Sequence, residues 1–414
     1  MLSTYLKRPH TLERYRSGPA GPHLDPFTGW LEARGYQSGR IRRLLHGLQH
    51  FSLWAREAGL TSQECDAKAL EAFRHDLQLQ QCLRYPNGNH RHLFVGARHF
   101  VTFLEKTGRL SPSDPSPPAS SEPQLFVAFR DWMATHRGTT TATLNTYRLT
   151  LIAVLQTLGD QPAQYDARAL RAFILDRARR HGVGQAKTLV TAVRMVLRFL
   201  IATGQCSPGL EHAIPTIARW RRASLPKYLS SEAVERVLAS CDLMTPMGRR
   251  DRAILLLLTR LGLRAGEVAA LKFRDLDWGA GTVQVSGKPR RQHRLPLPQA
   301  IGDAILHYLD HRPEMDNDHV FLSIIAPFQS LSRQAVGQIA TQAIHRAGVE
   351  TPVHGSHVLR SSAATDMLRH GVPLLAIGSV LRHASMETTM DYAKVDFHLL
   401  QQVVRPWPED TIWS

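Results

Sequence analysis

The stretch Leu381–Ala393 reads LRHASMETTMDYA, and three shorter segments precede it in the last third of the chain. They are LGLRAGE at Leu261–Glu267, VSGK at Val285–Lys288 and GSHVLR at Gly355–Arg360. Each segment carries one or two side chains of the kinds that bind phosphate, move protons or act as nucleophiles. These residues are Arg264, Lys288, His357, Arg360, His383 and Tyr392.

The chemistry of this set suits the breaking of DNA by a protein nucleophile. Arginine guanidinium groups neutralise and orient a phosphate through paired hydrogen bonds. Histidine and lysine can move protons or donate to oxygens that gain charge. A tyrosine hydroxyl can attack phosphorus and hold the broken end covalently. The set therefore predicts a DNA-cleaving site with Tyr392 as its nucleophile.

The residues before Arg264 predict a buried helix that ends at a turn. The apolar run Ala253–Leu258 is typical of such a helix, and the glycine-flanked Arg264 follows its end, where it can project into a cleft. Glu267 would start a second helix. By itself, an arginine such as Arg264 is far more often an ordinary charged residue at a helix turn. The three other segments favour the functional interpretation.

The segments from His357 onward predict two more helices. His357 and Arg360 are three residues apart, so a helix places both on one face. The small residues Ser361–Thr365 permit close packing of this helix against a neighbour. The interval between His383 and Tyr392 suits a short turn followed by a helix that carries the tyrosine. A tyrosine is more often a half-buried core residue, but its context here argues for the nucleophile.

The sequence around Lys288 predicts a β-hairpin with a basic tip. Val283–Val285 alternates in polarity, and Arg294–Leu297 resumes the pattern after a basic loop. Pro289 stiffens the tip and removes an amide donor. A solvated basic turn without a catalytic lysine stays an open alternative.

Over about Pro226–Val395, these segments resemble the catalytic domain of the tyrosine recombinases, the phage-integrase and Xer family. The resemblance implies a site-specific recombinase or integrase that breaks and rejoins DNA through a 3′-phosphotyrosyl intermediate, and so moves or integrates a mobile element. It assigns Arg264 and Arg360 to the scissile phosphate, with Glu267 in a supporting position. It makes Tyr392 the attacking residue.

The same resemblance also assigns the residues that transfer protons or donate to the phosphate. It implies that His357 assists proton transfer at the tyrosine and that His383 donates a hydrogen bond to the phosphate. Lys288 matches the family's catalytic lysine, which protonates the departing 5′ oxygen. The family's commoner continuation is a second glycine, whereas this chain has a proline followed by Arg290 and Arg291. Either arginine therefore stays an alternative general acid.

The resemblance implies neither a metal ion nor another cofactor, because arginines would do the charge neutralisation that divalent ions perform in other nucleases. No Walker-type GxxxxGK[ST] loop for ATP occurs in the sequence. Three alternatives stay open. One is a type IB topoisomerase, which relaxes a single duplex by similar chemistry. The others are a catalytically silent DNA-binding relative and a basic scaffold that never binds DNA. A duplicated helical unit in the upstream half and the close His383–Tyr392 context favour recombination over the topoisomerase. The complete six-residue set argues against the silent relative, and the scaffold does not explain the motifs.

The composition points to a polyanionic partner. The chain has 414 residues, with 51 Lys and Arg against 35 Asp and Glu, a formal net charge of +16. This length predicts two or three domains, and the charge favours double-stranded DNA. The cysteines form no CxxC pair, so neither a zinc site nor a disulfide framework is expected. Without a signal-peptide core or a membrane-spanning apolar run, we expect a cytoplasmic, nucleoid-associated protein of bacterial type.

The upstream half contains an internal repeat. Asp66–Phe73 and Asp166–Phe173 are identical at six of eight positions, and Val95–Pro112 aligns without gaps with Thr191–Pro208. Each copy reads as about four amphipathic helices. The Pro- and Ser-rich segment 111–123 between them is typical of a linker.

The fold class follows from the resemblance: mainly α, with a small antiparallel β-sheet in the C-terminal part. The second copy occupies the place of the family's helical, SAM-like core-binding domain, and the first would duplicate it. Such a pair is more typical of transposon-borne recombinases, including those encoded in trios. A helical interaction module that never touches DNA is the alternative for the first copy. The expected divisions are 1–112, the linker 113–123, 124–222, the catalytic domain 223–395 and the tail 396–414.

Basic clusters upstream of the catalytic segments are the expected DNA contacts, although each could equally be a solvated face. Such contacts would mostly bind phosphate and would not read sequence. Exchanging two duplexes requires four cleavages, so we expect four protomers on two DNA sites, with other recombinases of the same element as candidate partners. The candidate DNA contacts are Arg40, Arg42, Arg43, Arg177, Arg179, Arg180, Gln185, Lys187, Arg219, Arg221, Arg222, Arg290 and Arg291.

Overall fold

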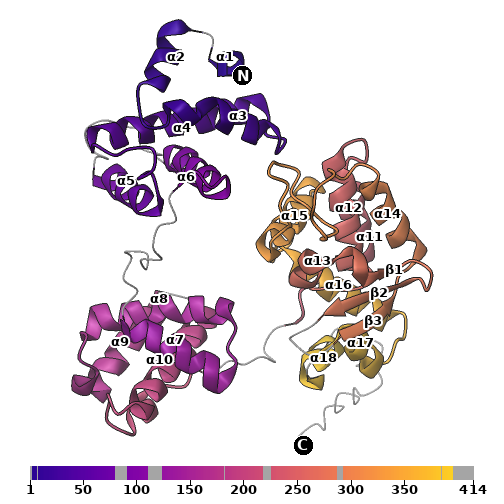
Figure 1. The fold of residues 1–414 in the computed structure, drawn as a ribbon. Helices are drawn as coiled ribbons and strands as arrows, with labels where there is room; N and C mark the ends of the chain where they lie inside the picture. Colours follow the sequence, from indigo (N-terminus) through magenta and orange to yellow (C-terminus); the bar gives the residue numbers. More distant parts are fainter. Residues whose placement is uncertain are drawn as a thin grey trace, which may run out of the picture. The chain divides into compact units, whose positions relative to one another are not determined.

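The computed structural model describes residues 2–6, 8–79, 91–110, 124–180, 182–217, 225–286, 292–383 and 385–394 (Figure 1). Over these residues the chain is mainly helical, with one three-stranded antiparallel sheet in its C-terminal part. The fold class expected from the sequence is confirmed. Among the described helices, none is long and apolar enough to cross a membrane.

The N-terminal helices pack around large aromatic side chains. Phe27 is fully buried, and its ring contacts those of Phe100 and Phe103. A Cβ atom added at Gly96 would lie 2.4 Å from the carbonyl oxygen of Leu44, so glycine permits two helix backbones to approach closely here. The helices are α1 (Leu2–Tyr5), α2 (Pro9–Arg16), α3 (Leu24–Glu32), α4 (Ser38–Glu57), α5 (Ala67–Leu79) and α6 (Arg91–Lys106), with the 3-10 helix η1 at Gly21–His23.

The next four helices surround a core of their own. Phe129, Leu151 and Leu200 are fully buried within it. The helices are α7 (Gln124–Arg137), α8 (Thr141–Leu158), α9 (Ala167–Arg179) and α10 (Val183–Ala202), with the 3-10 helices η3 at Pro162–Gln164 and η4 at Leu210–Ala213.

The sequence repeat is accompanied by repeated local geometry. The ring centroids of Trp30 and Phe103 are 5.8 Å apart, and those of Trp132 and Phe199 are 5.9 Å apart. The carboxylate before α5 and the one before α9 cap their helices in the same way, because each accepts a hydrogen bond from the backbone three residues later. The repeat thus preserves both the packing and the helix start. The predicted domain boundaries themselves stay a prediction.

The C-terminal part contains helices α11 to α18 and the sheet. Thr245 begins α12 by accepting a hydrogen bond from Gly248 N at 3.1 Å, and Pro246 has a φ angle suited to the first helical position. The elements are α11 (Ser231–Ala239), α12 (Pro246–Thr259), α13 (Ala265–Ala270), η6 (Phe273–Asp275), β1 (Leu276–Asp277), β2 (Thr282–Ser286), β3 (Gln292–Pro296), α14 (Gln299–Leu309), α15 (Arg333–Arg346), α16 (Ser356–Arg369), α17 (Leu374–Val380) and α18 (Met386–Ala393).

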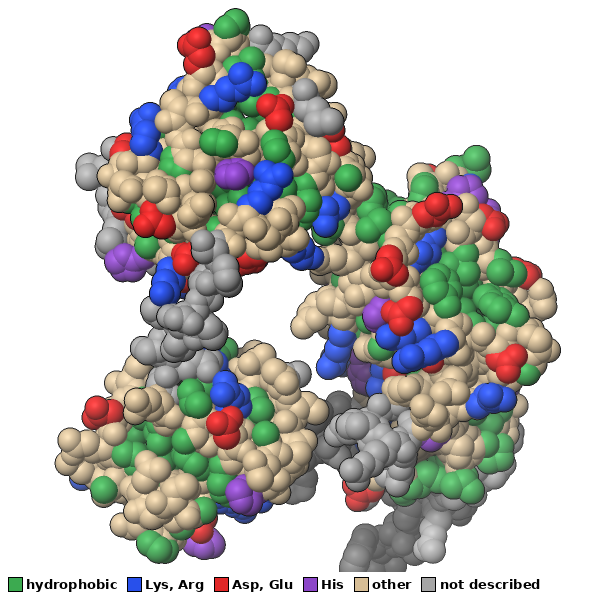
Figure 2. Space-filling view, viewed as in Figure 1, with side chains coloured by type: hydrophobic (Ala, Val, Ile, Leu, Met, Phe, Trp, Pro, Cys, Tyr) green, Lys and Arg blue, Asp and Glu red, His purple; other side chains and the backbone are tan. Residues whose placement is uncertain are grey.

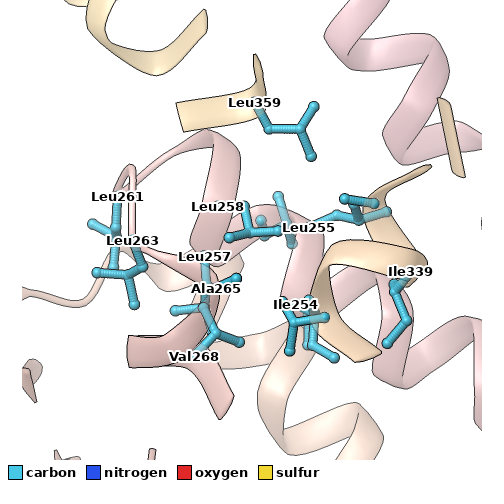
Figure 3. Close-up of a cluster of buried hydrophobic side chains, with 14 of the residues drawn as sticks. Ile254, Leu255, Leu257, Leu258, Leu261, Leu263, Ala265, Val268, Ile339 and Leu359 are labelled. Atoms are coloured by element: carbon cyan, nitrogen blue, oxygen red, sulfur yellow. The ribbon is translucent and has the colours of Figure 1, made fainter. Parts of the chain in front are cut away.

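Helix α12 is the central element of this core, as the apolar run predicted. Its residues Ile254, Leu255, Leu257 and Leu258 are fully buried, and Leu359 of α16 belongs to the same cluster (Figure 3). Burial of each such side chain stabilises the fold by about 1.5–3 kcal/mol relative to exposure. This packing holds the end of α12 rigidly where Arg264 follows.

The predicted hairpin is present as β2 and β3. The two strands pair antiparallel, with Val283 opposite Leu295 and both side chains buried. The sheet order is β1-β2-β3. The basic tip, residues 287–291, lies outside the described residues.

Candidate active site

The turn between α12 and α13 presents Arg264. Gly262 adopts φ 57°, and a Cβ atom there would lie 2.5 Å from a side-chain carbon of Leu381, so the turn requires glycine. Arg264 is the residue before α13, and Glu267 reaches back to its backbone N–H at 2.7 Å, which satisfies a donor at the helix start. The predicted helix–turn–helix is confirmed.

Glu267 is a buried carboxylate shared by two arginines. Its side chain is 5% exposed. It accepts from Nη1 of Arg264 at 2.8 Å and from Nη2 of Arg382 at 2.8 Å. Burial raises the pKa of Glu267, but the hydrogen bonds from Arg264 and the charge of Arg382 outweigh burial and leave the pKa lowered. The carboxylate is therefore ionised, and it binds the Nη1 atom of Arg264.

Helix α16 carries His357 and Arg360 three residues apart, as predicted. Arg360 is only 4% exposed and donates to the carbonyl oxygens of Gly262 and Leu381. Burial, with the positive charges of two neighbouring arginines, lowers the pKa of Arg360 to about 10, so it is still charged at neutral pH. Burial and the charges of Arg360 and Arg264 lower the pKa of His357. The imidazole of His357 is therefore neutral near pH 7, in the field of the positive charges of Arg360 and Arg264.

Helices α17 and α18 bring His383 to Tyr392 across the predicted turn. The Nδ1 atom of His383 lies 2.8 Å from Oγ1 of Thr389, which is fully buried on α18. The rings of His383 and Tyr392 are stacked, with centroids 6.2 Å apart and an interplanar angle of 12°. Tyr392 is 6% exposed and packs with residues of α16 and α17, including Ile377 and Leu381. The nucleophile predicted from the sequence therefore lies beside the predicted phosphate ligand.

The electrostatic field of this cluster is positive. The pKa of His383 is lowered to about 4 by burial first and then by the charges of Arg360, Arg264 and Arg382. Among the described residues, Glu267 is the carboxylate that pairs with Arg264 and Arg382. A group that gains negative charge, such as a phosphate under attack, would be stabilised by such a field. Figure 2 shows lysine and arginine side chains beside histidines on the surface of the C-terminal part.

The sequence-based reasoning missed two residues of this site. Arg382 pairs with Glu267 and accepts, through its carbonyl oxygen, a hydrogen bond from Nη2 of Arg264 at 3.0 Å. Thr389 holds His383. The sequence did contain a signal for each residue. Arg382 is a charged residue directly before His383, and Thr389 lies one helical turn before Tyr392.

Two other tyrosines of the C-terminal part, Tyr308 and Tyr228, have hydroxyl groups that already form hydrogen bonds. Tyr308 is 2% exposed, and its hydroxyl accepts from the backbone N of Leu322 at 3.1 Å. The hydroxyl of Tyr228 accepts from Arg369 at 2.8 Å. Tyr228 also packs against the cluster that contains Tyr392, but its hydroxyl is bound to Arg369 on the same helix as Arg360.

Several predicted residues lie outside the described ranges. Lys288, Arg290 and Arg291 belong to the hairpin tip, and Arg219, Arg221 and Arg222 belong to the segment before the C-terminal part. Their roles stay predictions. Within the described ranges, no group of three or more His, Cys, Asp or Glu side chains is arranged to hold a metal ion.

The remaining candidate DNA contacts are on helices of the upstream half. Arg42 and Arg43 are exposed on α4, and Arg40 is partly buried there. Their placement does not test a role in DNA binding. The others lie at the end of α9 and the beginning of α10: Arg177, Arg179, Arg180, Gln185 and Lys187. Among these, Arg180 forms an ion pair with a carboxylate on α9 at 2.8 Å.

Several known proteins are similar to this chain. Residues 227–398 match the sequence model of the Phage integrase family. The chain is 33% identical over 406 residues to the putative integrase/recombinase y4rA of Sinorhizobium fredii, which covers 96% of this chain and 97% of that protein. It is 33% identical over 224 residues to the tyrosine recombinase XerD of Listeria innocua, covering 52% of this chain and 73% of that protein.

Solved structures show the same fold. The recombinase XerH bound to a palindromic difH substrate, in a post-cleavage complex, matches with a TM-score of 0.57 at 20% identity, covering 74% of this chain and 94% of that one. A lambda integrase tetramer bound to a Holliday junction matches with a TM-score of 0.51 at 16% identity, covering 76% and 89%.

The fold and site define an enzyme that breaks and rejoins DNA, a tyrosine-type site-specific recombinase. The chain belongs to the phage integrase family of tyrosine recombinases. The family and the enzyme class expected from the sequence motifs are confirmed.

Proposed function

We propose that this recombinase moves or integrates a mobile element by joining the 3′ phosphate of cut DNA to Tyr392. The observation that carries the proposal is the position of Arg360. Its guanidinium group ties the turn at Gly262 to the turn at Leu381. The residue that would clamp the phosphate is thereby fixed between Arg264 and the helix that bears the nucleophile.

Arg264 and Arg360 hold the two non-bridging oxygens of the scissile phosphate in this proposal. Their charges stabilise the pentacovalent transition state, where negative charge accumulates on those oxygens. Arg264 is suited to meet DNA because its side chain is 45% exposed while its inner side is bound to Glu267. Arg360 is held by backbone carbonyls and needs no rearrangement when DNA binds.

Proton transfer falls to the neighbouring histidines and the lysine. Because its pKa is lowered, His357 is neutral near pH 7 and can accept a proton from Tyr392. In this proposal the Thr389 hydroxyl, 2.8 Å from Nδ1 of His383, donates to that nitrogen, so the ring proton lies on Nε2 for a hydrogen bond to the phosphate. Lys288 protonates the departing 5′ oxygen.

The reaction conserves the phosphodiester bonds. The bond between phosphorus and the 5′ oxygen breaks as the bond to the tyrosine oxygen forms. The 5′ hydroxyl of a partner duplex then attacks the phosphotyrosine, and the tyrosine leaves with a proton. The energy of the broken bond is kept in the phosphotyrosine, so no ATP is consumed.

Double-stranded DNA is the partner, and four protomers assemble on two DNA sites. The XerH match is to a protein bound to difH substrate, and the lambda integrase match is to a tetramer on a Holliday junction. These support the proposal at the level of the fold. Other recombinases of the same element are further candidate partners, and the cytoplasm and nucleoid are the proposed location. We keep the division of the chain at 112, 123, 222 and 395 as part of this proposal.

A suicide substrate tests the function. A nicked DNA duplex that loses a short fragment after cleavage traps any phosphotyrosine as a complex that survives denaturing electrophoresis. We expect such a complex with DNA that carries the element's end. A complex that forms equally well on DNA of unrelated sequence, combined with relaxation of supercoiled DNA by a single protomer, would instead identify a topoisomerase, and no complex on any substrate would reject the covalent chemistry.

A further inference from the structure

Arg382 has a backbone conformation that arginine rarely adopts. Its φ angle is 55°, in the left-handed region that favours glycine. The residue ends the turn after α17, and its side chain is 2% exposed. A long cationic side chain thus occupies a strained and buried position directly before His383. Strain of this kind persists only where surrounding interactions hold it.

The contacts of Arg382 converge on Arg264. Its Nη2 donates to Oε2 of Glu267 at 2.8 Å, and its Nη1 donates to the carbonyl oxygen of Val380 at 2.8 Å. Its own carbonyl oxygen accepts from Nη2 of Arg264 at 3.0 Å. Glu267 in turn accepts from Nη1 and from the backbone N–H of Arg264. Both terminal nitrogens of Arg264 are therefore anchored, one through Glu267 and one by Arg382 itself.

We propose that Arg382 is a positioning residue for cleavage, which holds Glu267 and the turn so that the Arg264 guanidinium faces the scissile phosphate. Arg382 occupies the second oxygen of Glu267 and keeps this carboxylate from forming a two-oxygen pair with the guanidinium of Arg264. The outer hydrogen bond donors of Arg264 stay available for the phosphate. The side chain of Arg382 is buried against Glu267, so its effect on cleavage passes through Arg264.

The charge of the site supports this arrangement. Burial raises the pKa of Glu267. The backbone hydrogen bond from Arg264 and the charge of Arg382 lower this pKa and outweigh burial. Without Arg382, the buried carboxylate would keep Arg264 as its cationic partner among the residues that the structure describes. A buried carboxylate attracts a neighbouring cation strongly when it has lost another one. Arg264 would then turn towards Glu267 and away from the phosphate.

The test compares Arg382→Met with Arg382→Lys in the full-length protein. Both variants keep a long, unbranched side chain at the same left-handed position, but only lysine keeps the charge and a donor for Glu267. We expect Arg382→Met to slow covalent complex formation on the suicide substrate by about 10- to 100-fold, as a small misplacement of a catalytic group does. Noncovalent DNA affinity should be unchanged, and Arg382→Lys should recover most of the rate.

A double-mutant cycle separates positioning through Glu267 from an independent effect. If Arg382 acts through Glu267, the rate loss in Arg382→Met/Glu267→Gln will be clearly smaller than the product of the two single losses. Multiplicative losses, or equal rates in Arg382→Met and Arg382→Lys, overturn the proposal. Arg382→Gly relieves the strained φ angle and replaces Arg382→Met if the latter does not fold. Failure of both neutral variants to fold assigns Arg382 to the stability of the turn and also overturns the proposal.

The proposal rests on the proposed function, because its readout is the phosphotyrosine. The two fail differently. A wild-type protein that forms no covalent complex rejects the cleavage chemistry. If the wild-type protein forms the covalent complex and Arg382→Met forms it equally fast, only the role of Arg382 is rejected.

Discussion

The imidazole ring of His383 lies nearly parallel to the phenol ring of Tyr392, with their centroids 6.2 Å apart. The same imidazole contacts Thr389, one turn before Tyr392 on α18. Because α18 also packs on α17 through a close approach of Gly378 to Thr389, the helix that bears the tyrosine is fixed at two points.

Tyr392→Phe should bind DNA normally but form no covalent complex on the suicide substrate. Phenylalanine keeps the ring that stacks on His383 and packs in the α16–α18 core, so folding should be unaffected. Denaturing electrophoresis of the cleavage reaction is the measurement. Covalent product from this variant would move the nucleophile to another residue, and Tyr228→Phe and Tyr308→Phe are then the variants to examine.

Arg264→Ala and Arg360→Ala should each lower the cleavage rate by a factor on the order of a hundred or more, the typical loss of one preorganised donor to a developing charge. Their effects on stability should differ. Arg360→Ala leaves two buried carbonyl oxygens without this donor, which should lower the free energy of unfolding by about 1–3 kcal/mol. Arg264 is half exposed, so its removal should matter less. Urea unfolding measures the difference, and near-normal cleavage in either variant would reject the phosphate clamp.

The stability of the protein should fall as the pH drops from 6.5 towards 4, and His383 should contribute to that fall. Burial and the nearby arginines lower the pKa of His383 to about 4 from the ordinary value of 6.5. In this window the unfolded chain binds the proton and the folded chain does not, so protonation favours unfolding. Thermal unfolding at several pH values measures the slope.

His383→Gln is the control for that slope, because glutamine does not titrate. Other histidines, including His357, keep their own contributions in the variant. The variant should therefore lose stability less steeply between pH 6.5 and 4. Equal slopes in both proteins would show that His383 keeps an ordinary pKa.

Lys288→Ala should cleave ordinary DNA slowly and recover on DNA whose bridging 5′ oxygen is replaced by sulfur. A thiolate leaves without being protonated, so it no longer needs a general acid. Single-turnover cleavage of the two substrates gives the comparison. If Arg290→Ala or Arg291→Ala shows the rescue while Lys288→Ala cleaves ordinary DNA well, the neighbouring arginine is the general acid.

A chain that begins near Ser120 tests whether the first helical copy contacts DNA. If it does, the shortened protein should bind a single site more weakly, with a lower salt dependence, because fewer counterions are released. Its footprint on DNA should also shorten. We expect this result because Arg42 and Arg43 are exposed on α4. Unchanged affinity and footprint, with loss of the four-protomer complex, would instead identify a protein-interaction module.

The sequence alone determined the local elements and the residue types of the site. An apolar run with helical spacing predicted α12, and alternating residues predicted the β2–β3 hairpin, because both patterns depend on the geometry of a single element. The spacing of His357 and Arg360 likewise fixed their common face on α16. The repeat was also visible in the sequence, since its aromatic and capping residues recur in order.

Only the tertiary structure decided how these segments meet. Arg360 donates to the carbonyl oxygen of Gly262, 98 residues away in the chain, and Arg382 pairs with Glu267, 115 residues away. No periodicity encodes such contacts, because they depend on how closely separate turns approach. Here the left-handed φ of 57° at position 262 favours glycine, and a Cβ atom there would also crowd the side chain of Leu381. The roles of Arg382 and Thr389 followed from that packing, since each acts on a partner brought to it by another part of the fold.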